Sequence, residues 1–208
     1  MTPLAHFEIV WERCAHLSAV HAYLEVNVVA ALNIDDLLRS EWAARVSALD
    51  LYIHELVAQR MREIFEGRRP ASPGYLRFKI SNETVNRIRS ASLPSDAGAA
   101  FDLEVRAQLG LLTFQDPEQI ANGIRLCSPI ELWNEVAIRL GATESTKNQN
   151  AKALKTDLSL IVGRRHKIVH EGDLQPTPPR TAWPIKRSDL SFVKDKIEEI
   201  VGAIDAIV

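Results

Sequence analysis

The sequence has few of the features that mark exported, metal-stabilised or membrane proteins. Only two of its 208 residues, Cys14 and Cys127, are cysteines, too few for a disulfide scaffold and without the paired spacing of a zinc site. No stretch approaches the roughly 20 uncharged apolar residues of a membrane span, and residues 1–8 contain no basic segment leading into an apolar run. We therefore expect a cytoplasmic protein without a membrane segment.

An excess of charge of one sign is also missing. The formal net charge is -2, with 25 Lys and Arg against 27 Asp and Glu, so any nucleic-acid contact requires a local basic patch rather than the whole surface. Hydrophobic residues at 46% and charged residues at 25% are typical of a globular protein and exclude a disordered or collagen-like chain. Nothing indicates two separate cores, and we expect one domain over residues 1–208.

The strict apolar alternation of β-strands is absent, and apolar residues recur at helical spacing. The pattern predicts an all-α protein that begins with two long helices, the first capped by Thr2 and reaching Val28, the second starting at Asp35 and stopped by Gly67. The later predicted elements are a loop over 68–74, helices over about 82–91, 96–114 and 117–126, a helix from Ser128 to Leu140, a long helix from about 150 to Gly172, a proline-rich extended strap over 176–184, and a last helix capped by Ser188 and ending at Val208.

Charged and titratable residues interrupt the apolar stripe of the long helix that ends at Gly172. Arg164, Arg165 and His166 are followed one turn later by His170. The stripe spacing places Arg165 toward the packed side, where an unpaired guanidinium costs several kcal/mol. Ideal geometry separates Arg165 from His170 by about 140°. Either Arg165 forms a core salt bridge and His170 sits at the helix C-terminus as a favoured cation, or both side chains open onto one cleft.

The run from Arg165 to His170 lies within the segment LSLIVGRRHKIVHEGD, near the end of a helical chain, and resembles the Arg-x4-6-His signature of HEPN domains. Among these domains, it is most similar to the RiboL-PSP-type group. The segment SALDLYIHELV at 47–57 is similar to the second helix of those domains, and IELWNEVAIRLG at 130–141 to the helix that precedes their catalytic helix. The resemblance covers most of the chain loosely. It implies an all-α, HEPN-like helical bundle with long antiparallel N-terminal helices, a long catalytic helix and additional short helices.

The resemblance also implies a function: an RNA endonuclease of the toxin or antiviral-defence type, a homodimer in which two motifs form one composite site, working without metal or other cofactor, with an antitoxin or defence-system protein as a possible partner. When a ribose 2′-OH attacks the neighbouring phosphate, one group removes its proton, another protonates the departing 5′ oxygen, and a cation stabilises the phosphorane. We assign proton transfer to His170 and charge stabilisation to Arg165. The alternative is a non-catalytic HEPN-type module that binds a nucleotide, an RNA or a partner protein.

Several neighbours have supporting roles under this resemblance. His166 stands where the family usually has a polar residue, often asparagine, and can donate a hydrogen bond to phosphate or orient His170. Arg164 and Lys167 are either phosphate contacts or ordinary solvated cations. Gly172 replaces the tyrosine that one HEPN toxin subgroup presents for nucleotidylation by its antitoxin, so that mode of neutralisation is not expected.

Asp50 and His54 lie one turn apart in the second helix. Either Asp50 pairs with Arg165 and orients it, or it forms a plain ion pair on its own helix. A metal site from His166, His170 and Glu171 is the less favoured alternative, because the glutamate between the histidines of a zinc-protease helix is missing.

Two further groups of residues have a structural and a functional interpretation. The tryptophans are expected to be core or interface anchors rather than base-stacking platforms. The Arg68–Arg69 loop and the strap over 176–184 either border an RNA path or are plain loops. The four tryptophans are Trp11, Trp42, Trp133 and Trp183.

Overall fold

Helices provide the regular structure of the chain. A computed structural model describes residues 1–27 and 33–208. Within these ranges no strand forms, and extended segments pair only at an isolated antiparallel bridge between Leu174 and Ala182. The all-α class is thus confirmed. The helices are α1 (Pro3–Asn27), α2 (Asp35–Phe65), α3 (Pro73–Arg77), α4 (Asn82–Ser90), α5 (Pro94–Leu109), α6 (Pro117–Cys127), α7 (Leu132–Arg139), α8 (Lys147–Glu171) and α9 (Arg187–Ile207).

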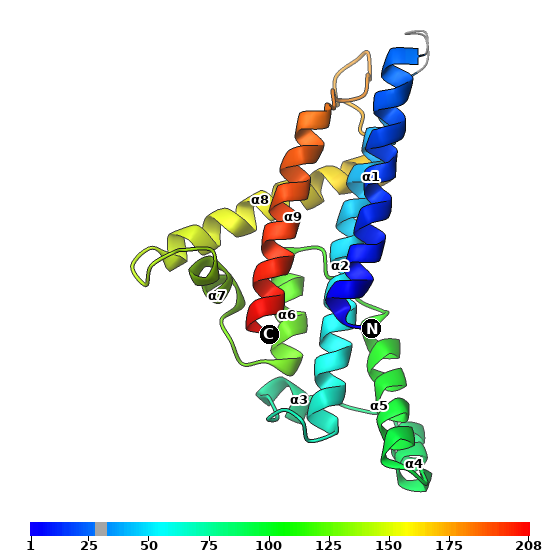
Figure 1. Ribbon diagram of the computed structural model, residues 1–208, viewed down its shortest axis with the longest axis vertical. Coiled ribbons are helices and arrows are strands. Elements are labelled where there is room, and N and C mark those ends of the chain that lie inside the picture. The colour runs from blue at the N-terminus through cyan, green and yellow to red at the C-terminus, as the bar shows by residue number, and fades with distance from the viewer. Residues whose placement is uncertain (28–32) are drawn as a thin grey trace.

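The two long N-terminal helices, α1 and α2, run antiparallel and lie side by side (Figure 1). The Thr2 hydroxyl accepts the Ala5 N–H at 3.1 Å, which makes Thr2 the N-cap of α1. Gly67, with φ 73°, takes the left-handed conformation just past α2. Both predicted signals are confirmed, while the predicted extension of the first helix to Val28 lies outside the described residues.

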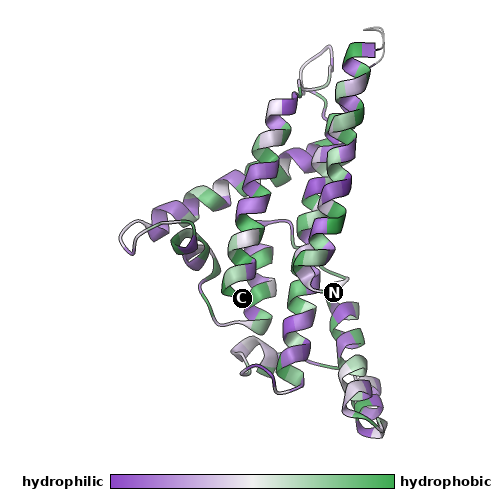
Figure 2. Ribbon diagram, in the orientation of Figure 1, coloured by the Kyte–Doolittle hydropathy of each residue, from purple (hydrophilic) through white to green (hydrophobic). Residues whose placement is uncertain are grey.

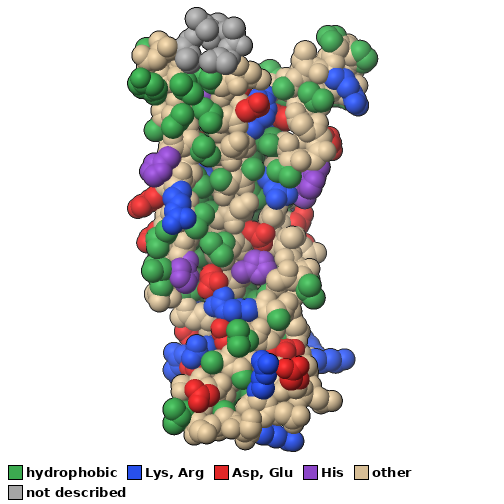
Figure 3. Space-filling model, turned by 90° about the vertical axis from the view of Figure 1, so that its right-hand side faces the viewer, with side chains coloured by type: hydrophobic (Ala, Val, Ile, Leu, Met, Phe, Trp, Pro, Cys, Tyr) green, Lys and Arg blue, Asp and Glu red, His purple; other side chains and the backbone are tan. Residues whose placement is uncertain are grey.

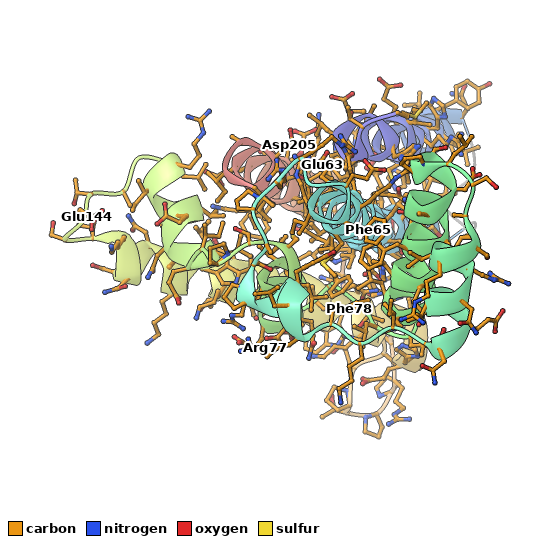
Figure 4. All side chains as sticks on the ribbon, turned by 90° about the horizontal axis from the view of Figure 1, so that it is seen from below. Glu63, Phe65, Arg77, Phe78, Glu144 and Asp205 are labelled. Carbon is orange, nitrogen blue, oxygen red and sulfur yellow. The ribbon has the colours of Figure 1, made fainter. Side chains whose placement is uncertain are left out.

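Helix α2 occupies the centre of the molecule, with α1, α5, α6 and α9 around it (Figure 4). Its side chains are therefore buried on several sides, Val46, Leu49 and Ile53 among them with no exposed surface. At its C-terminal end Phe65 stacks on Phe101 of α5 with ring centroids 4.6 Å apart. Burial on several sides explains why a helix of this length is stable without a single apolar stripe.

Helix α8 crosses the bundle rather than running along it (Figure 1). Its buried stripe contacts α2, α7 and α9, and the Trp42 indole of α2 donates to the Ile161 carbonyl at 2.9 Å. Hydrophilic and hydrophobic residues alternate along α1, α8 and α9 (Figure 2), as expected for helices with one packed face. Gly172, with φ 65°, is the left-handed C-cap of α8, as predicted.

Several predicted boundaries are wrong for local reasons. The predicted loop over 68–74 contains the start of α3, because the Ser72 side chain accepts the Tyr75 N–H at 3.0 Å. Helix α5 ends at Leu109 instead of about residue 114, and the Phe114 N–H donates to Asp50 at 2.6 Å. Helix α7 begins only at Leu132, and α8 begins already at Lys147 rather than near residue 150.

The cap of α9 is also not the predicted one. The helix begins at Arg187, with Lys186 at the N-cap position. The Asp189 carboxylate accepts the Lys186 N–H at 2.9 Å, so Asp189 satisfies this terminus and Ser188 does not.

The proline-rich segment over 176–184 is not an extended strap. It folds back on itself, since the Gln175 N–H donates to the Thr181 carbonyl at 2.9 Å and the Trp183 N–H donates to the Asp173 carbonyl at 2.8 Å. The turn brings Trp183 back against the C-terminal part of α8, with the Lys167 ammonium 6.0 Å from its ring centroid.

The buried apolar side chains form one continuous cluster to which α1, α2 and α5 to α9 contribute. Among the helices of the described residues, none combines the length and the apolar character needed to cross a membrane. The cluster leaves the outer face of α8 in contact with solvent at Ser159, Leu160 and Gly163.

Candidate functional site at the end of helix α8

Arg164, and not Arg165, makes the structural ion pair of this helix end. The Arg164 guanidinium donates to the Asp173 carboxylate at 3.0 Å and to the Pro184 carbonyl at 2.8 Å. It also lies 5.3 Å from the Trp42 ring centroid. Asp173 has no exposed surface and accepts a second hydrogen bond from Arg39 of α2 at 3.0 Å. The core salt bridge considered for Arg165 is therefore formed by its neighbour.

Arg165 is half-buried, and its Nε is enclosed by protein without a hydrogen-bond partner. The expected packed-side placement is thus met in part, but the expected counter-ion is not found among the described residues. A guanidinium without an internal ion pair can bind an anion through its terminal amino groups. This distinguishes Arg165 from Arg164, which donates to Asp173 and to the Pro184 carbonyl, although the Nε of Arg164 is likewise enclosed without a partner.

His166 and His170 are both exposed and lie on one face of α8. Their rings are nearly parallel, with centroids 5.8 Å apart and an interplanar angle of 23°. Two imidazoles at this separation can contact one ligand group, or the two ends of one phosphodiester, from the same side. The structure thus brings His166 and His170 together.

Arg165 and His170, in contrast, lie on different faces within one chain. They are five positions apart, which corresponds to about 140° around an ideal helix. A hollow of about 370 Å³ beside the end of α8 is not lined by either of them. Its lining residues are Ser159, Leu160, Gly163, Arg164, Lys167, Asp173 and Trp183.

Asp50 does not pair with Arg165. Its carboxylate accepts the Phe114 N–H at 2.6 Å and the Gln115 side-chain amide at 2.9 Å, and it lies 3.4 Å from His54 Nε2. Burial alone would raise the pKa of Asp50, but these hydrogen bonds and the charge of His54 outweigh burial and lower it. Asp50 therefore forms the helical pair with His54 and anchors the segment after α5, away from the Arg165–His170 motif.

The tryptophans do not all belong to the core. Trp11, Trp42 and Trp133 are buried as expected, but Trp183 is 38% exposed. Of the two expected roles, core and interface anchor, the core role is wrong for Trp183, because the folded-back segment places its ring on the surface of α8 instead of inside the cluster. No signal in the sequence separated this tryptophan from the others except its proline-rich neighbourhood.

The Arg68–Arg69 loop is held by ion pairs. Arg68 pairs with Glu66, and Arg69 pairs with Glu63 at 2.7 Å and also binds the Val208 carbonyl. These arginines stabilise the end of α2 and the C-terminus. They provide no free cation for an RNA path.

Glu171 does not join His166 and His170 in a metal-binding arrangement. Across residues 1–27 and 33–208, no three or more His, Cys, Asp or Glu side chains are grouped so that they could hold a metal ion.

Comparison of the chain with protein-family models, with curated proteins and with solved structures found no match in any of the three. The function is therefore argued from the residues of α8 and the segment that packs on it.

Proposed function

We propose that this chain is a metal-independent RNA endonuclease of the HEPN kind, in which Arg165 and His170 act on the scissile phosphate. The proposal rests on the observation that two adjacent arginines differ in their ion pairs. Arg164 makes the buried ion pair with Asp173, while Arg165 has no counter-ion in the described chain and is followed along α8 by the exposed imidazoles of His166 and His170. A cation and two proton-exchanging groups are the set that cleavage by the 2′-OH requires.

In the proposed reaction a neutral imidazole removes the proton of the ribose 2′-OH, and the 2′ oxygen attacks the neighbouring phosphorus. The bond from phosphorus to the 5′ oxygen breaks, and a protonated imidazole donates its proton to that oxygen. The products are a 2′,3′-cyclic phosphate and a 5′-OH end. The Arg165 guanidinium stabilises the negative charge that develops on the phosphorane oxygens.

A homodimer supplies the geometry that one chain lacks. Because Arg165 and His170 lie about 140° apart on an ideal helix, one phosphate does not reach both side chains from a single face of α8. A phosphate between two copies can contact Arg165 of one and His170 of the other, and the second His170 then provides the second proton-transfer group. The setting of a toxin or antiviral protein, restrained by an antitoxin or another defence-system partner, is proposed from the resemblance alone.

Cleavage of a mixed RNA in excess chelator tests the proposal. The wild-type protein is compared with His170→Ala and Arg165→Ala, and with His16→Ala and Arg13→Ala as matched controls, since these two residues are exposed on α1. We expect chelator-resistant cleavage that leaves 2′,3′-cyclic phosphate ends, is lost in the two site variants and persists in the controls. Cleavage at wild-type rates by His170→Ala would refute the proposal.

The second candidate is a non-catalytic module that binds RNA through the same helix. The observation that favours it is a row of lysines along α8, Lys152, Lys155 and Lys167, that line surface hollows and form no ion pair with a described residue. Tight RNA binding by a wild-type protein that leaves the RNA intact would establish this alternative in place of the nuclease.

A further inference from the structure

Four adjoining hollows follow one side of α8 from its first turns to its end. They measure about 260, 450, 370 and 420 Å³. The first and second share Lys152 and Lys155. The second and third share Ser159 and Leu160, and the third and fourth share Lys167 and Trp183. We name this row of hollows, each of which shares lining residues with the next, the α8 groove.

The floor of the groove is a single face of the helix. The lining residues at positions 148, 152, 155, 159, 163, 167 and 171 follow one another at intervals of three or four. From the first to the last the groove extends about 34 Å at the rise of an α-helix. His166 and His170 lie three and seven positions after Gly163, so they border the same face. Neither imidazole lines one of the four hollows, but both lie on the helix face that the groove follows.

Positive charge along the groove is available for a ligand. Lys152, Lys155, Lys167 and Arg180 line it, and none of the four forms an ion pair with a described residue. On the face of the molecule drawn in Figure 3, by comparison, basic and acidic side chains are interspersed.

Two of the five acidic residues that line the groove are paired with arginines of the protein. Asp116 caps α6 by accepting the Glu118 N–H at 3.1 Å, and Glu118 lies 3.5 Å from Arg125. Asp173 is neutralised by Arg39 and Arg164. Asp116, Glu131 and Glu171 form no ion pair with a described residue. Four unpaired cations against three unpaired carboxylates leave the groove with a small excess of positive charge, which favours an anionic ligand.

An aromatic platform stands at the end of the groove nearest the motif. Trp183 lines two of the hollows, is 38% exposed and has the Lys167 ammonium 6.0 Å from its ring centroid. Gly163 lines the same hollow, and a Cβ at that position would have nothing within 4 Å, which shows open space above the helix. A tryptophan next to a cation offers one surface for a base and one charge for its phosphate.

We propose that the α8 groove is a track for single-stranded RNA, in which Lys152, Lys155 and Lys167 bind phosphates and Trp183 stacks on an unpaired base. The inference rests on the proposed ribonuclease in taking RNA as the ligand, and it adds the path by which the strand reaches His166 and His170. Cations that follow a backbone and an aromatic ring that accepts any base are the combination that binds single strands without sequence preference. A duplex fits poorly, because its bases are already stacked on one another.

Binding is measured with the His170→Ala protein, so that the RNA remains intact. The probe is a fluorescein-labelled, mixed-sequence RNA of about 12 nucleotides, a length within the range of single-strand binding sites, and anisotropy gives Kd at several salt concentrations. Groove variants are Lys152→Ala with Lys155→Ala, and separately Trp183→Ala and Trp183→Phe. The control carries Arg77→Ala with Lys79→Ala, which removes the same charge at the end of the molecule seen in Figure 4.

The double lysine variant should lower the slope of log Kd against log salt by about 0.7 for each phosphate that the protein no longer neutralises. Trp183→Ala should weaken binding roughly tenfold, Trp183→Phe should retain most of the affinity, and the control should bind like its parent. The single strand should bind more tightly than a duplex of the same length.

The two proposals fail separately. Unchanged Kd and salt slope in the groove variants, or a preference for the duplex, would overturn the track even if wild-type protein cleaves RNA. Weaker binding by the groove variants of a protein whose wild type never cleaves RNA would uphold the track and refute the ribonuclease. Circular dichroism of each variant excludes misfolding as the cause of weaker binding.

Discussion

Asp173 and Arg39 are separated by 134 positions, and their side chains meet inside the protein, where Arg39 Nε donates to Asp173 Oδ2 at 3.0 Å. The same carboxylate binds Arg164 of α8. The backbone of Asp173 also bonds to the Lys167 carbonyl and to the Trp183 N–H. One buried residue therefore joins α2, the end of α8 and the segment that carries the exposed tryptophan, and the arrangement of the candidate site depends on it.

Removing the negative charge of Asp173 should destabilise the fold strongly. Asp173→Asn keeps the side-chain shape and tolerates the φ of 55° at this position, but it leaves Arg39 and Arg164 without their shared counter-ion. We expect the free energy of unfolding, measured in urea, to fall by about 3–5 kcal/mol. Glu171→Gln, two positions earlier and exposed, is the control and should change stability by less than about 0.5 kcal/mol. Equal unfolding midpoints for Asp173→Asn and wild type would contradict this role.

Substitution of Arg164 should mainly lower the stability of the protein, whereas substitution of Arg165 should mainly lower its activity. Arg164→Ala breaks a hydrogen bond to a buried carboxylate, and we expect it to lower the free energy of unfolding by about 1.5–3 kcal/mol. Arg165→Ala removes a side chain without an internal counter-ion and should change stability by about 0.5 kcal/mol or less, yet it should slow RNA cleavage by about 100-fold or more. Urea unfolding and initial cleavage rates measure the two effects. The reverse pattern would assign the structural role to Arg165.

Substitution by alanine should change the stability of the protein in opposite directions at Gly172 and at Gly163. Gly172 adopts φ 65°, and a side chain in the left-handed region costs about 1–2 kcal/mol, so Gly172→Ala should destabilise by that amount. Gly163 is inside α8 with open space where a Cβ would lie, so Gly163→Ala should stabilise by about 0.5–1 kcal/mol. Thermal unfolding of both variants, read with wild type as reference, measures the difference. Destabilisation by Gly163→Ala would contradict the open space at that position, and an unchanged stability of Gly172→Ala would contradict the left-handed conformation of Gly172.

Asp50 should contribute stability that acid removes. Its pKa is lowered in the folded protein because hydrogen bonds from His54, Gln115 and Phe114 outweigh the effect of burial. The contribution is therefore fully present above the unfolded pKa of about 3.9 and is lost as the pH falls through the lower folded value. Asp50→Asn should be less stable than wild type by about 1–3 kcal/mol at pH 7, and the difference should shrink as the pH falls below about 3.9.

The control for this pH dependence is Asp195→Asn, an exposed position on α9. Its difference from wild type should be small at every pH. A difference between Asp50→Asn and wild type that stays constant from neutral to acidic pH would show that the Asp50 charge does not stabilise the fold.

Capping residues predicted the helix ends correctly where the backbone group that they bind lies within a few positions in the sequence. Thr2, Ser81 and Gly172 act within three or five positions of their partners: Thr2 binds the Ala5 N–H, Ser81 binds the Thr84 N–H at 3.1 Å, and the Gly172 N–H donates to the Lys167 carbonyl. The same logic missed α3, although the pair Ser72–Pro73 is an N-cap followed by a proline at the first turn. The N-cap signal is present in the sequence, but the many prolines and glycines around it favour the prediction of a loop.

The candidate site could be predicted only in its location. Apolar spacing placed the motif at the end of a long helix, but it assigned the packed side to Arg165, and the ion pair belongs to Arg164. The spacing of one helix cannot choose between adjacent positions when the partner carboxylate, Asp173, lies beyond the helix in a turn with positive φ. Of the two roles considered for Asp50, the ion pair on its own helix is found with His54 and the pair with Arg165 is not, because Phe114 and Gln115 also bind the carboxylate.

The order of apolar, capping and turn residues by itself determined that this chain is built of helices, and approximately where each helix except α3 begins and ends, because helix formation depends on contacts within a few positions. Only the tertiary structure decided that α8 crosses the bundle, that the proline-rich segment folds back onto it, and that Trp183 lies at the surface beside Lys167. These features depend on contacts between distant segments, above all the buried meeting of Asp173 with Arg39, and no pattern within one helix encodes them.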